Sequence, residues 1–263
     1  MKTIILSAGH TPDSLPENTG CTHIIAGSAL LREKIPADCL RDDSGENISV
    51  KNREYCELTA LYWAWKNLDA EIIGLCHYRR FFASPSCRGS FLQPDEADYL
   101  LRFFDVLLPS ERNYIFETNY TQYCNSHNAA DLDLTRSIIM ERHPEYLEAF
   151  ETRMSMTRGH RFNMFVMRKP LADEYCEWLF DILSELEKRL DISCYTEGDR
   201  RVFGFVAERL LDVWMDANGL HTTDLDYIFI GKEHLARKAL AMTVRKIRAG
   251  LKNAQNRLNH KES

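Results

Sequence analysis

The segment IIGLCHYRRFF (residues 72–82) decides the fold of this chain. Its first residues are apolar or small, which is typical of a strand buried on both faces. The preceding residues 51–67 lead into it with apolar side chains at helical spacing, namely Leu58, Leu61, Tyr62, Trp65 and, just beyond, Leu68. A helix that runs into a buried strand is the unit of an α/β layered domain. The polar group at 77–80 would then follow the strand, where open α/β sheets bind ligands.

The same alternation continues along the chain. Short apolar runs predict strands and longer periodic stretches predict helices. We expect strands at 3–6, 71–76, 103–109 and 163–167, and helices at 51–67, 134–154 (despite Pro144), 172–190 and 203–211. This order predicts an α/β fold with a central, mostly parallel or mixed sheet, in a single domain over residues 1–230.

Composition describes a globular protein. A chain of 263 residues with 44% hydrophobic residues can bury a sizeable core. No apolar run approaches the roughly 20 residues of a membrane span, and the first residues lack the apolar core of a signal peptide. The eight cysteines form no CxxC pair and no metal-ligand spacing. We therefore expect a cytoplasmic chain with reduced thiols.

The last residues form a basic tail. Residues 231–263 contain nine Lys/Arg and two Glu, whereas the whole chain has a net charge of −6. Apolar residues recur there at steps of three and four: Leu240, Val244, Ile247, Leu251, Ala254 and Leu258. This pattern predicts a basic amphipathic helix that contacts an anionic membrane surface through residues 235–258. The alternative is a terminal helix packed on its own domain or on a partner. The tail has no aromatic residue to stack on a base, which argues against a nucleic-acid partner.

Arg79 and Arg80 form the most informative polar pair. Neighbouring side chains of an extended segment point in opposite directions, so one arginine can enter a crevice while the other faces solvent. Arginine binds phosphate with two parallel hydrogen bonds and keeps its charge at any relevant pH. The alternative is an ion network with carboxylates at 42–46 or 131–133. The chain has no glycine-rich phosphate loop, so a bound diphosphate would have to be held by such side chains.

Four segments together resemble one known family: ENISVKNREYCELTALYWAWKN (46–67), IIGLCHYRRFF (72–82), NMFVMRK (163–169) and RVFGFVAERLL (201–211). It is a bacterial family of domains of unknown function marked by NIS and YRR motifs. Its members occur in capsular polysaccharide, exopolysaccharide and O-antigen gene clusters. The family is grouped with glycosyltransferases, and galactofuranosyl transfer is among its assigned activities. The resemblance covers about residues 3–230 and departs at CTHIIAG (21–27), where the family has Pro-Ile-x-Val-Gly; donor or acceptor preference could differ there.

This resemblance implies a GT-A-like glycosyltransferase. The donor would be a nucleotide-diphosphate sugar, UDP-linked and including UDP-galactofuranose. The acceptor would be a growing lipid-linked oligosaccharide at the inner face of the membrane. Many GT-A enzymes hold a metal with an Asp-x-Asp motif where this chain has HYRR (77–80). We therefore expect arginine charge in place of a metal, with Mg²⁺ or Mn²⁺ needed only if the diphosphate is metal-bound.

Several polar residues are candidates for donor binding. Beside Arg79 and Arg80 they are Tyr78, Asp43, Asn47, Ser49, Asn52 and Asn163, with Asp42 as a further neighbour. Asp42, Asp43 and Asn47 also suit a turn, which is an equally good explanation for them.

Sugar transfer with inversion needs a base near the acceptor hydroxyl. Glu197 and Asp199, in the loop TEGDRR (196–201), are the first candidates, and Glu208 in the following helix is the second. His77 suits either a catalytic or a structural role. Glu57 is a further residue expected to face the site, whereas Trp63 and Trp65 suit helix packing.

Two other classes remain open at this level. One is a non-catalytic nucleotide-sugar or glycan-binding scaffold of a polysaccharide assembly complex. The other is a phosphate-handling hydrolase, which would also need arginines beside acids. Turnover separates the three classes: a transferase needs an acceptor, a hydrolase does not, and a scaffold binds without turnover.

Overall fold

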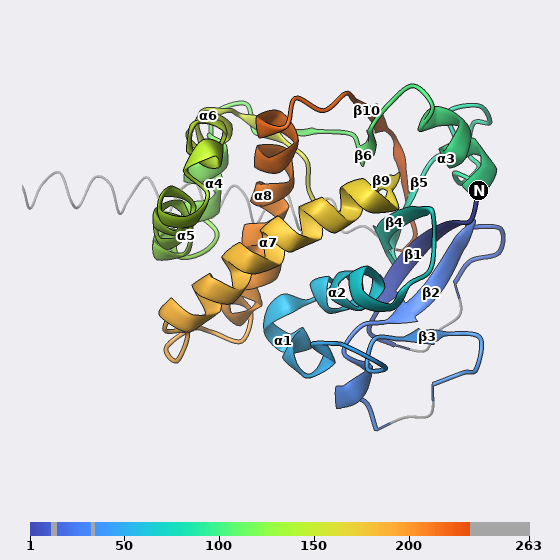
Figure 1. Cartoon of the computed structure of the whole chain (residues 1–263), viewed down its shortest axis with the longest axis horizontal. Coiled ribbons are helices and arrows are strands. Elements are labelled where there is room, and N and C mark those ends of the chain that lie inside the picture. The colour runs from blue at the N-terminus through green and yellow to red at the C-terminus, as the bar shows by residue number, and fades with distance from the viewer. Residues whose placement is uncertain (12–14, 33–34, 232–263) are drawn as a thin grey trace, which may run out of the picture.

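The computed structural model describes residues 1–11, 15–32 and 35–231 (Figure 1). Its strands and helices alternate along the chain, as the sequence predicts. Beyond its first residue, the predicted basic helix at 231–263 lies outside the described residues, and so does its membrane contact through residues 235–258. Within the ranges given, no helix is both long enough and apolar enough to cross a membrane.

The core of the fold is one nine-stranded sheet. The strands are β1 Thr3–Gly9, β2 Cys21–Ile25, β3 Leu40–Arg41, β4 Ile72–His77, β5 Arg80–Phe82, β6 Val106–Pro109, β9 Phe165–Arg168, β10 Thr222–Leu225 and β11 Tyr227–Phe229. Their main order is β10-β6-β9-β4-β1-β2-β3, and β5 joins β4 to β11. Along the main order every pair is parallel except the two that β9 makes. The predicted mostly parallel sheet is confirmed.

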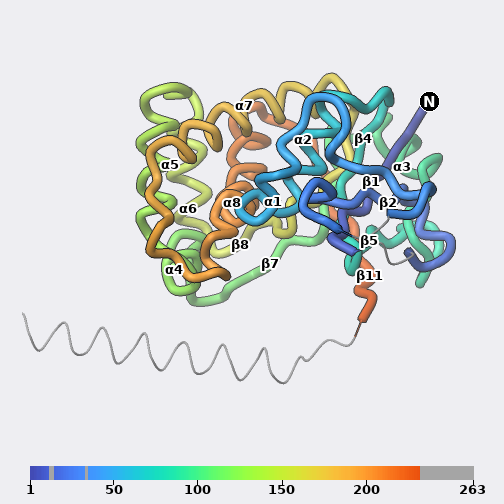
Figure 2. The backbone as a smooth tube through the Cα atoms, turned by 90° about the horizontal axis from the view of Figure 1, so that it is seen from below, coloured from blue at the N-terminus to red at the C-terminus, as the bar shows by residue number. Residues whose placement is uncertain are grey.

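The helices cover the two faces of the sheet unequally. They are α1 Asn52–Tyr55, α2 Leu58–Asn67, α3 Pro94–Leu100, α4 Asn119–Cys124, α5 Ala129–Arg142, α6 Leu147–Ser155, α7 Lys169–Arg189 and α8 Val202–Ala217. One face packs on a large core that includes side chains of α2, α7 and α8, and the other on a small core that includes α3. Figures 1 and 2 both show α4, α5 and α6 grouped at the end of the molecule away from β1 and β2.

Side-chain alternation along β1 serves both cores. Leu6 and Ala8 face the large core, and Ile5 faces the small one, because successive residues of a strand point to opposite faces. In the neighbouring strand β4, a Cβ at Gly74 would lie 3.0 Å from the Val166 side chain and 3.1 Å from that of Ile5. Glycine at this position lets the central strands pack closely against each other.

Two predicted helices are interrupted. The helix expected at 51–67 breaks at Cys56, whose backbone has φ 52° and ψ −133°. The helix expected at 134–154 is two helices, α5 and α6, separated at His143 and Pro144. Proline has no N–H to donate and disfavours the helical conformation in the residue before it, so the continuous helix was a wrong prediction.

Several element boundaries also differ from the prediction. Strand β6 begins at Val106, strand β9 begins at Phe165, and helix α7 begins at Lys169 rather than at Ala172. Pro170 lies in the first turn of α7, where its missing N–H costs no helical hydrogen bond.

The arginine pair lies in a hairpin. His77 pairs with Arg80 across an antiparallel connection, so Tyr78 and Arg79 form the turn between β4 and β5. The expectation of two arginines in one extended segment is therefore wrong. Arg79 is exposed on the turn, while Arg80 is half-buried at the start of β5.

Candidate active site

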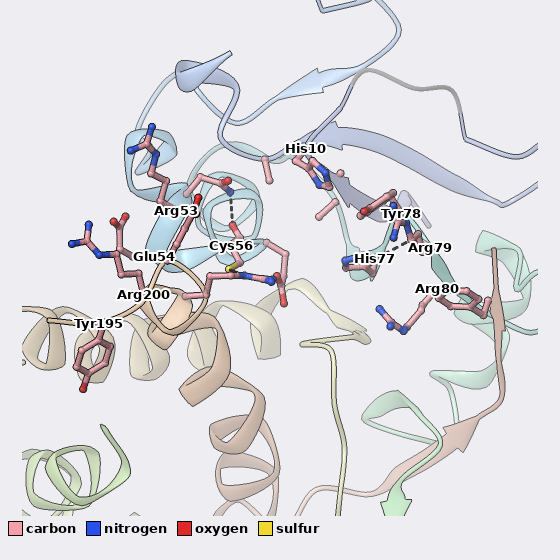
Figure 3. Close-up of a pocket in the computed structure, with 18 residues that line it drawn as sticks. His10, Arg53, Glu54, Cys56, His77, Tyr78, Arg79, Arg80, Tyr195 and Arg200 are labelled. Carbon is pink, nitrogen blue, oxygen red and sulfur yellow. Dashed lines mark hydrogen bonds between the residues drawn. The ribbon is translucent and has the colours of Figure 1, made fainter. Parts of the chain in front are cut away.

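An open pocket of about 1360 Å³ lies where β1, β2 and β4 end (Figure 3). Gly9 and His10 line it from the end of β1, Ala26 from the end of β2, and His77 and Tyr78 from the end of β4. Because these strands are parallel, their carboxyl ends meet at one edge of the sheet. The pocket is therefore at the edge where ligands bind in open α/β sheets.

Arginines line both sides of this pocket. Figure 3 shows Arg79 and Arg80 on one side and Arg53 and Arg200 on the other, and Arg201 also lines the pocket. Within the described residues, none of the five forms an ion pair with a carboxylate. The pocket thus offers several guanidinium groups to an anionic ligand.

The ion network considered as an alternative for Arg79 and Arg80 is not formed by the described residues. Asp43 instead pairs with Arg41, and Asp131 accepts hydrogen bonds from the hydroxyls of Tyr123 and Tyr195. These acids are occupied by other partners, so they leave the arginines available to a ligand.

Aromatic rings hold Arg80. Its guanidinium lies 4.1 Å from the centroid of the Phe162 ring and 5.4 Å from that of Phe229. A ring face attracts a guanidinium without neutralising its charge. The arrangement orders the Arg80 side chain and leaves its hydrogen-bond donors for a ligand.

His77 is neutral in this environment. Its Nδ1 accepts a hydrogen bond from the Arg79 backbone N–H at 3.2 Å, which fixes the hairpin turn. Burial, together with the charges of Arg80 and Arg79, lowers the pKa of His77 to about 3. A histidine that stays neutral at physiological pH supports the turn and is a poor proton donor.

Glu57 lines the pocket directly after the break in the first helix. Asn163 donates a hydrogen bond from its Nδ2 to Glu57 Oε1 at 2.8 Å and a second one to the Gly204 carbonyl at 3.1 Å. Asn163 is only 3% exposed. Burial raises the pKa of Glu57, although the Asn163 hydrogen bond and the charges of Arg201 and Arg80 oppose the shift.

Glu208 lies near this carboxylate, on α8. Its Oε1 accepts a hydrogen bond from the backbone N–H of Phe162 at 3.2 Å, and its side chain is 22% exposed. Burial raises its pKa to about 7; Arg161 lowers it and the charge of Glu57 raises it further. A carboxyl group with this pKa can exchange a proton near neutral pH.

The backbone is strained around these two acids. Cys56, Phe162 and Asn163 have φ values of 52°, 77° and 51°. Such conformations are uncommon for residues other than glycine and cost on the order of 1–3 kcal/mol each. One strained residue precedes Glu57, and the other two contact Glu57 and Glu208 through hydrogen bonds. Strain of this kind persists where the surrounding structure enforces it, often at functional sites.

Other predicted donor contacts lie outside the pocket. The Asp42 carboxylate is fully buried and accepts hydrogen bonds from the Gly27 and Ser28 backbones and from the hydroxyl of Ser49. Asn47 bonds to the Gly45 carbonyl and accepts from the Ser49 N–H. The structure therefore gives Asp43, Asn47 and Ser49 local partners and does not bring them to the pocket.

Asn52 is in the pocket wall. Its Nδ2 donates to the Cys56 carbonyl at 2.7 Å and to the Thr59 hydroxyl at 3.0 Å, so it fixes the helix break. Nearby, Trp63 is 8% exposed and Trp65 stacks on Phe180, which confirms their packing role.

The acids of the loop 196–201 are less enclosed by the protein than Glu57 and Glu208. Glu197 lines the pocket but is exposed to solvent. Asp199 accepts a hydrogen bond from the Thr196 hydroxyl and lies 3.7 Å from His127. Neither acid is held in a buried position.

The sequence interpretation missed the arginines on the far side of the pocket. Arg200 and Arg201 form a second adjacent pair, directly after the acids that drew attention in TEGDRR (196–201). A search for repeated Arg-Arg pairs would have found them. In the part of the chain that the structure describes, no group of three or more His, Cys, Asp or Glu side chains is arranged to hold a metal ion.

The fold and pocket define an α/β domain with a ligand site at the carboxyl ends of its parallel strands. The chain is similar to a solved apo structure of the bifunctional glycosyltransferase WbbM, with a TM-score of 0.81 and 28% sequence identity. The match covers 88% of this chain and 46% of that protein, so the chain spans a little under half of its length. Residues 4–219 match the family described as "Domain of unknown function (DUF4422)", and the chain belongs to this family. No curated protein matches the chain.

Proposed function

We propose that this protein is a glycosyltransferase that moves a sugar from a nucleotide-diphosphate donor to a growing oligosaccharide. The observation that carries the proposal is the pocket at the carboxyl ends of β1, β2 and β4, lined by arginines without carboxylate partners among the described residues. The similarity to WbbM, a bifunctional glycosyltransferase, supports the same reaction class.

The arginines suit a diphosphate leaving group. Negative charge grows on the nucleoside diphosphate as its bond to the sugar breaks, and fixed guanidinium groups stabilise that charge in the transition state. Each charge-assisted hydrogen bond contributes on the order of 1.5–3 kcal/mol. Arg80, whose guanidinium lies beside the Phe162 and Phe229 rings, would take this role, and Arg79 and Arg201 would complete the cradle.

The reaction also needs a group that takes the proton of the acceptor hydroxyl. Burial raises the pKa values of two acids near the pocket, Glu57 and Glu208. A hydrogen bond fixes the position of each: the buried Asn163 side chain donates to Glu57, and the Phe162 backbone N–H donates to Glu208. The proposed chemistry is therefore arginine stabilisation of the leaving group combined with carboxylate catalysis at the acceptor.

The family resemblance narrows the proposed substrates. It favours a UDP-linked donor, with UDP-galactofuranose among the sugars to test, and an acceptor from capsular polysaccharide, exopolysaccharide or O-antigen synthesis. A lipid-linked acceptor would place the reaction at the inner membrane face. The basic residues of the segment 235–258 would keep the protein there.

Calorimetric titration with UDP tests the donor site. We expect UDP binding that survives EDTA and weakens at least tenfold in Arg80→Ala, because one charge-assisted contact is lost. Arg79→Ala should weaken binding less, since Arg79 is exposed. The matched control is Arg88→Ala, an exposed arginine outside the pocket. Loss of binding in EDTA would show that a divalent metal holds the diphosphate. If the wild-type protein binds no UDP under any condition, this assignment of the arginines is wrong.

A further inference from the structure

We infer that Glu57 is the catalytic base of the transfer and that Asn163 is its positioning residue. The inference rests on the proposed glycosyltransferase function and adds the group that accepts the proton. The Glu57 side chain lines the pocket and accepts a hydrogen bond from the buried side chain of Asn163.

The first argument is the position of Glu57 in the chain. It follows Cys56, whose left-handed φ ends α1, and it precedes the first residue of α2. The carbonyl of Cys56 is held by Asn52 Nδ2 at 2.7 Å, so the break is fixed from inside the pocket wall. Helix α8 passes close by at Gly204, where a Cβ would lie 3.3 Å from the Cys56 side chain. Gly204 on α8 and the strained Cys56 before α2 together fix the position of Glu57.

The second argument is the support from the opposite side. Asn163 Nδ2 holds Glu57 Oε1 at 2.8 Å and is itself tied to the Gly204 carbonyl at 3.1 Å. Asn163 has φ 51°, a conformation that asparagine tolerates better than most residues, and it follows Phe162 with φ 77°. Left-handed residues thus flank the Glu57 carboxylate on two separate chain segments. Strained residues on two segments around one side chain are expected where a reactive group must be held in one orientation.

The third argument is the charge around Glu57. Arg80 and Arg201 line the same pocket, and their charges act on this carboxylate. A base beside the diphosphate-binding arginines is close to the sugar carbon that is attacked. Glu208 does not line the pocket, and Glu197 is exposed with no buried group to hold it. Glu57 alone among these three acids has both contact with the pocket and a fixed orientation.

The proposed step is a single displacement. The acceptor oxygen forms a bond to the anomeric carbon while the bond from that carbon to the donor phosphate oxygen breaks. The bonding electron pair leaves with the nucleoside diphosphate, whose charge the arginines stabilise. The acceptor hydroxyl proton moves to the Glu57 carboxylate, which returns it to water after product release.

Glu57→Gln and Glu57→Asp test the base directly. The assay is UDP release from UDP-galactose and UDP-galactofuranose in the presence of an oligosaccharide acceptor, in parallel with UDP titration. We expect kcat to fall at least 100-fold in Glu57→Gln, while KM stays within threefold. UDP should bind equally or more tightly, because a negative charge beside the arginines is removed. Glu57→Asp should keep a residual, pH-dependent rate, and Glu148→Gln, an exposed charge on α6, is the control.

Asn163→Gly tests the positioning role without forcing the backbone, because glycine accepts the left-handed φ of this position. The Asn163 hydrogen bond lowers the pKa of Glu57, so its loss should raise that pKa. The acid limb of the kcat profile should then move to higher pH and kcat should fall about tenfold. A purely structural role for Asn163 would change the melting temperature and leave the pH limb in place.

The outcomes separate this inference from the proposed function. Turnover in Glu57→Gln at more than a third of the wild-type rate would overturn the inference and leave the transferase intact. UDP binding without cleavage of any donor would make the protein a scaffold and overturn both. Absence of UDP binding in the wild-type protein would remove the donor site on which the inference rests. Melting curves identify any variant that fails to fold.

Discussion

Glu208 and Asp212 are both acids and lie one turn apart on the same helix, α8. Their environments nevertheless shift their pKa values in opposite directions. Asp212 is 3% exposed and accepts hydrogen bonds from the backbone N–H of His160 at 3.0 Å and from its ring. Burial alone would raise the pKa of Asp212, but His160 and Arg153 outweigh it and the pKa is lowered. Glu208 has one backbone donor, and its pKa rises to about 7.

The difference shows how one helix serves both stability and chemistry. Asp212 belongs to a saturated network in which His160 also contacts Asp224 at 3.0 Å, and Arg153 binds Asp216. Burial works against protonation of His160, but the two carboxylates raise its pKa to about 9, so it is charged at neutral pH. A carboxylate with a full set of partners stays ionised and holds the fold. One with few partners, near a pocket, can gain and lose a proton.

Removal of the Asp212 carboxylate should have the largest effect on stability. Asp212→Ala leaves His160 and Arg153 with one fewer counter-charge in a buried place. Breaking a buried ion pair costs about 3–5 kcal/mol, and we expect a loss of this size in the free energy of unfolding measured in urea at pH 7. The control is Asp69→Ala, whose side chain is 97% exposed in its pair with Lys2 and whose removal should change the free energy of unfolding far less. Equal effects would mean that the two networks do not differ as described.

Removal of the Glu208 charge should increase stability, whereas removal of the Asp212 charge decreases it. Its pKa is raised from an ordinary 4.5 to about 7, so the folded state disfavours the ionised form. The penalty is absent below pH 4.5, grows as the pH rises to about 7, and then stays on the order of 3 kcal/mol. Glu208→Gln should therefore stabilise the protein at pH 8 and leave it nearly unchanged at pH 4.5. Melting temperatures at the two pH values measure the effect, and a variant less stable at pH 8 would refute it.

The order of the strands and helices was predictable because it depends on local apolar patterns. Strand β4 and the helix before it follow from residues 51–76, and the pocket follows from the rule that ligands bind at the carboxyl ends of parallel strands. The break at Cys56 was not predictable, since cysteine is no helix breaker. Its φ depends on Asn52 within the same segment and on the close approach of Gly204 from far along the chain.

The site was predictable only in part for the same reason. Arg79 and Arg80 stand out because charges follow an apolar run. Glu57 looks like an ordinary helical glutamate until Asn163, more than a hundred residues away in sequence, is brought to 2.8 Å from it. Asp43 and Asn47 were predicted as donor contacts because Asp and Asn often bind hydroxyl groups. Asp and Asn also form turns, and these two residues bond locally within a turn.

The loop acids should give the smallest effects. Glu197 is exposed and Asp199 bonds to the Thr196 hydroxyl, so water or a neighbour already solvates each charge. We expect Glu197→Gln and Asp199→Asn to change the kcat of UDP release by less than threefold, against at least 100-fold in Glu57→Gln. A solvated carboxylate is a weak base and is not fixed relative to the acceptor. If Glu197→Gln instead lowered kcat more than tenfold with UDP binding unchanged, the base would belong to this loop. Burial and strain would then be the wrong guides to catalysis in this pocket.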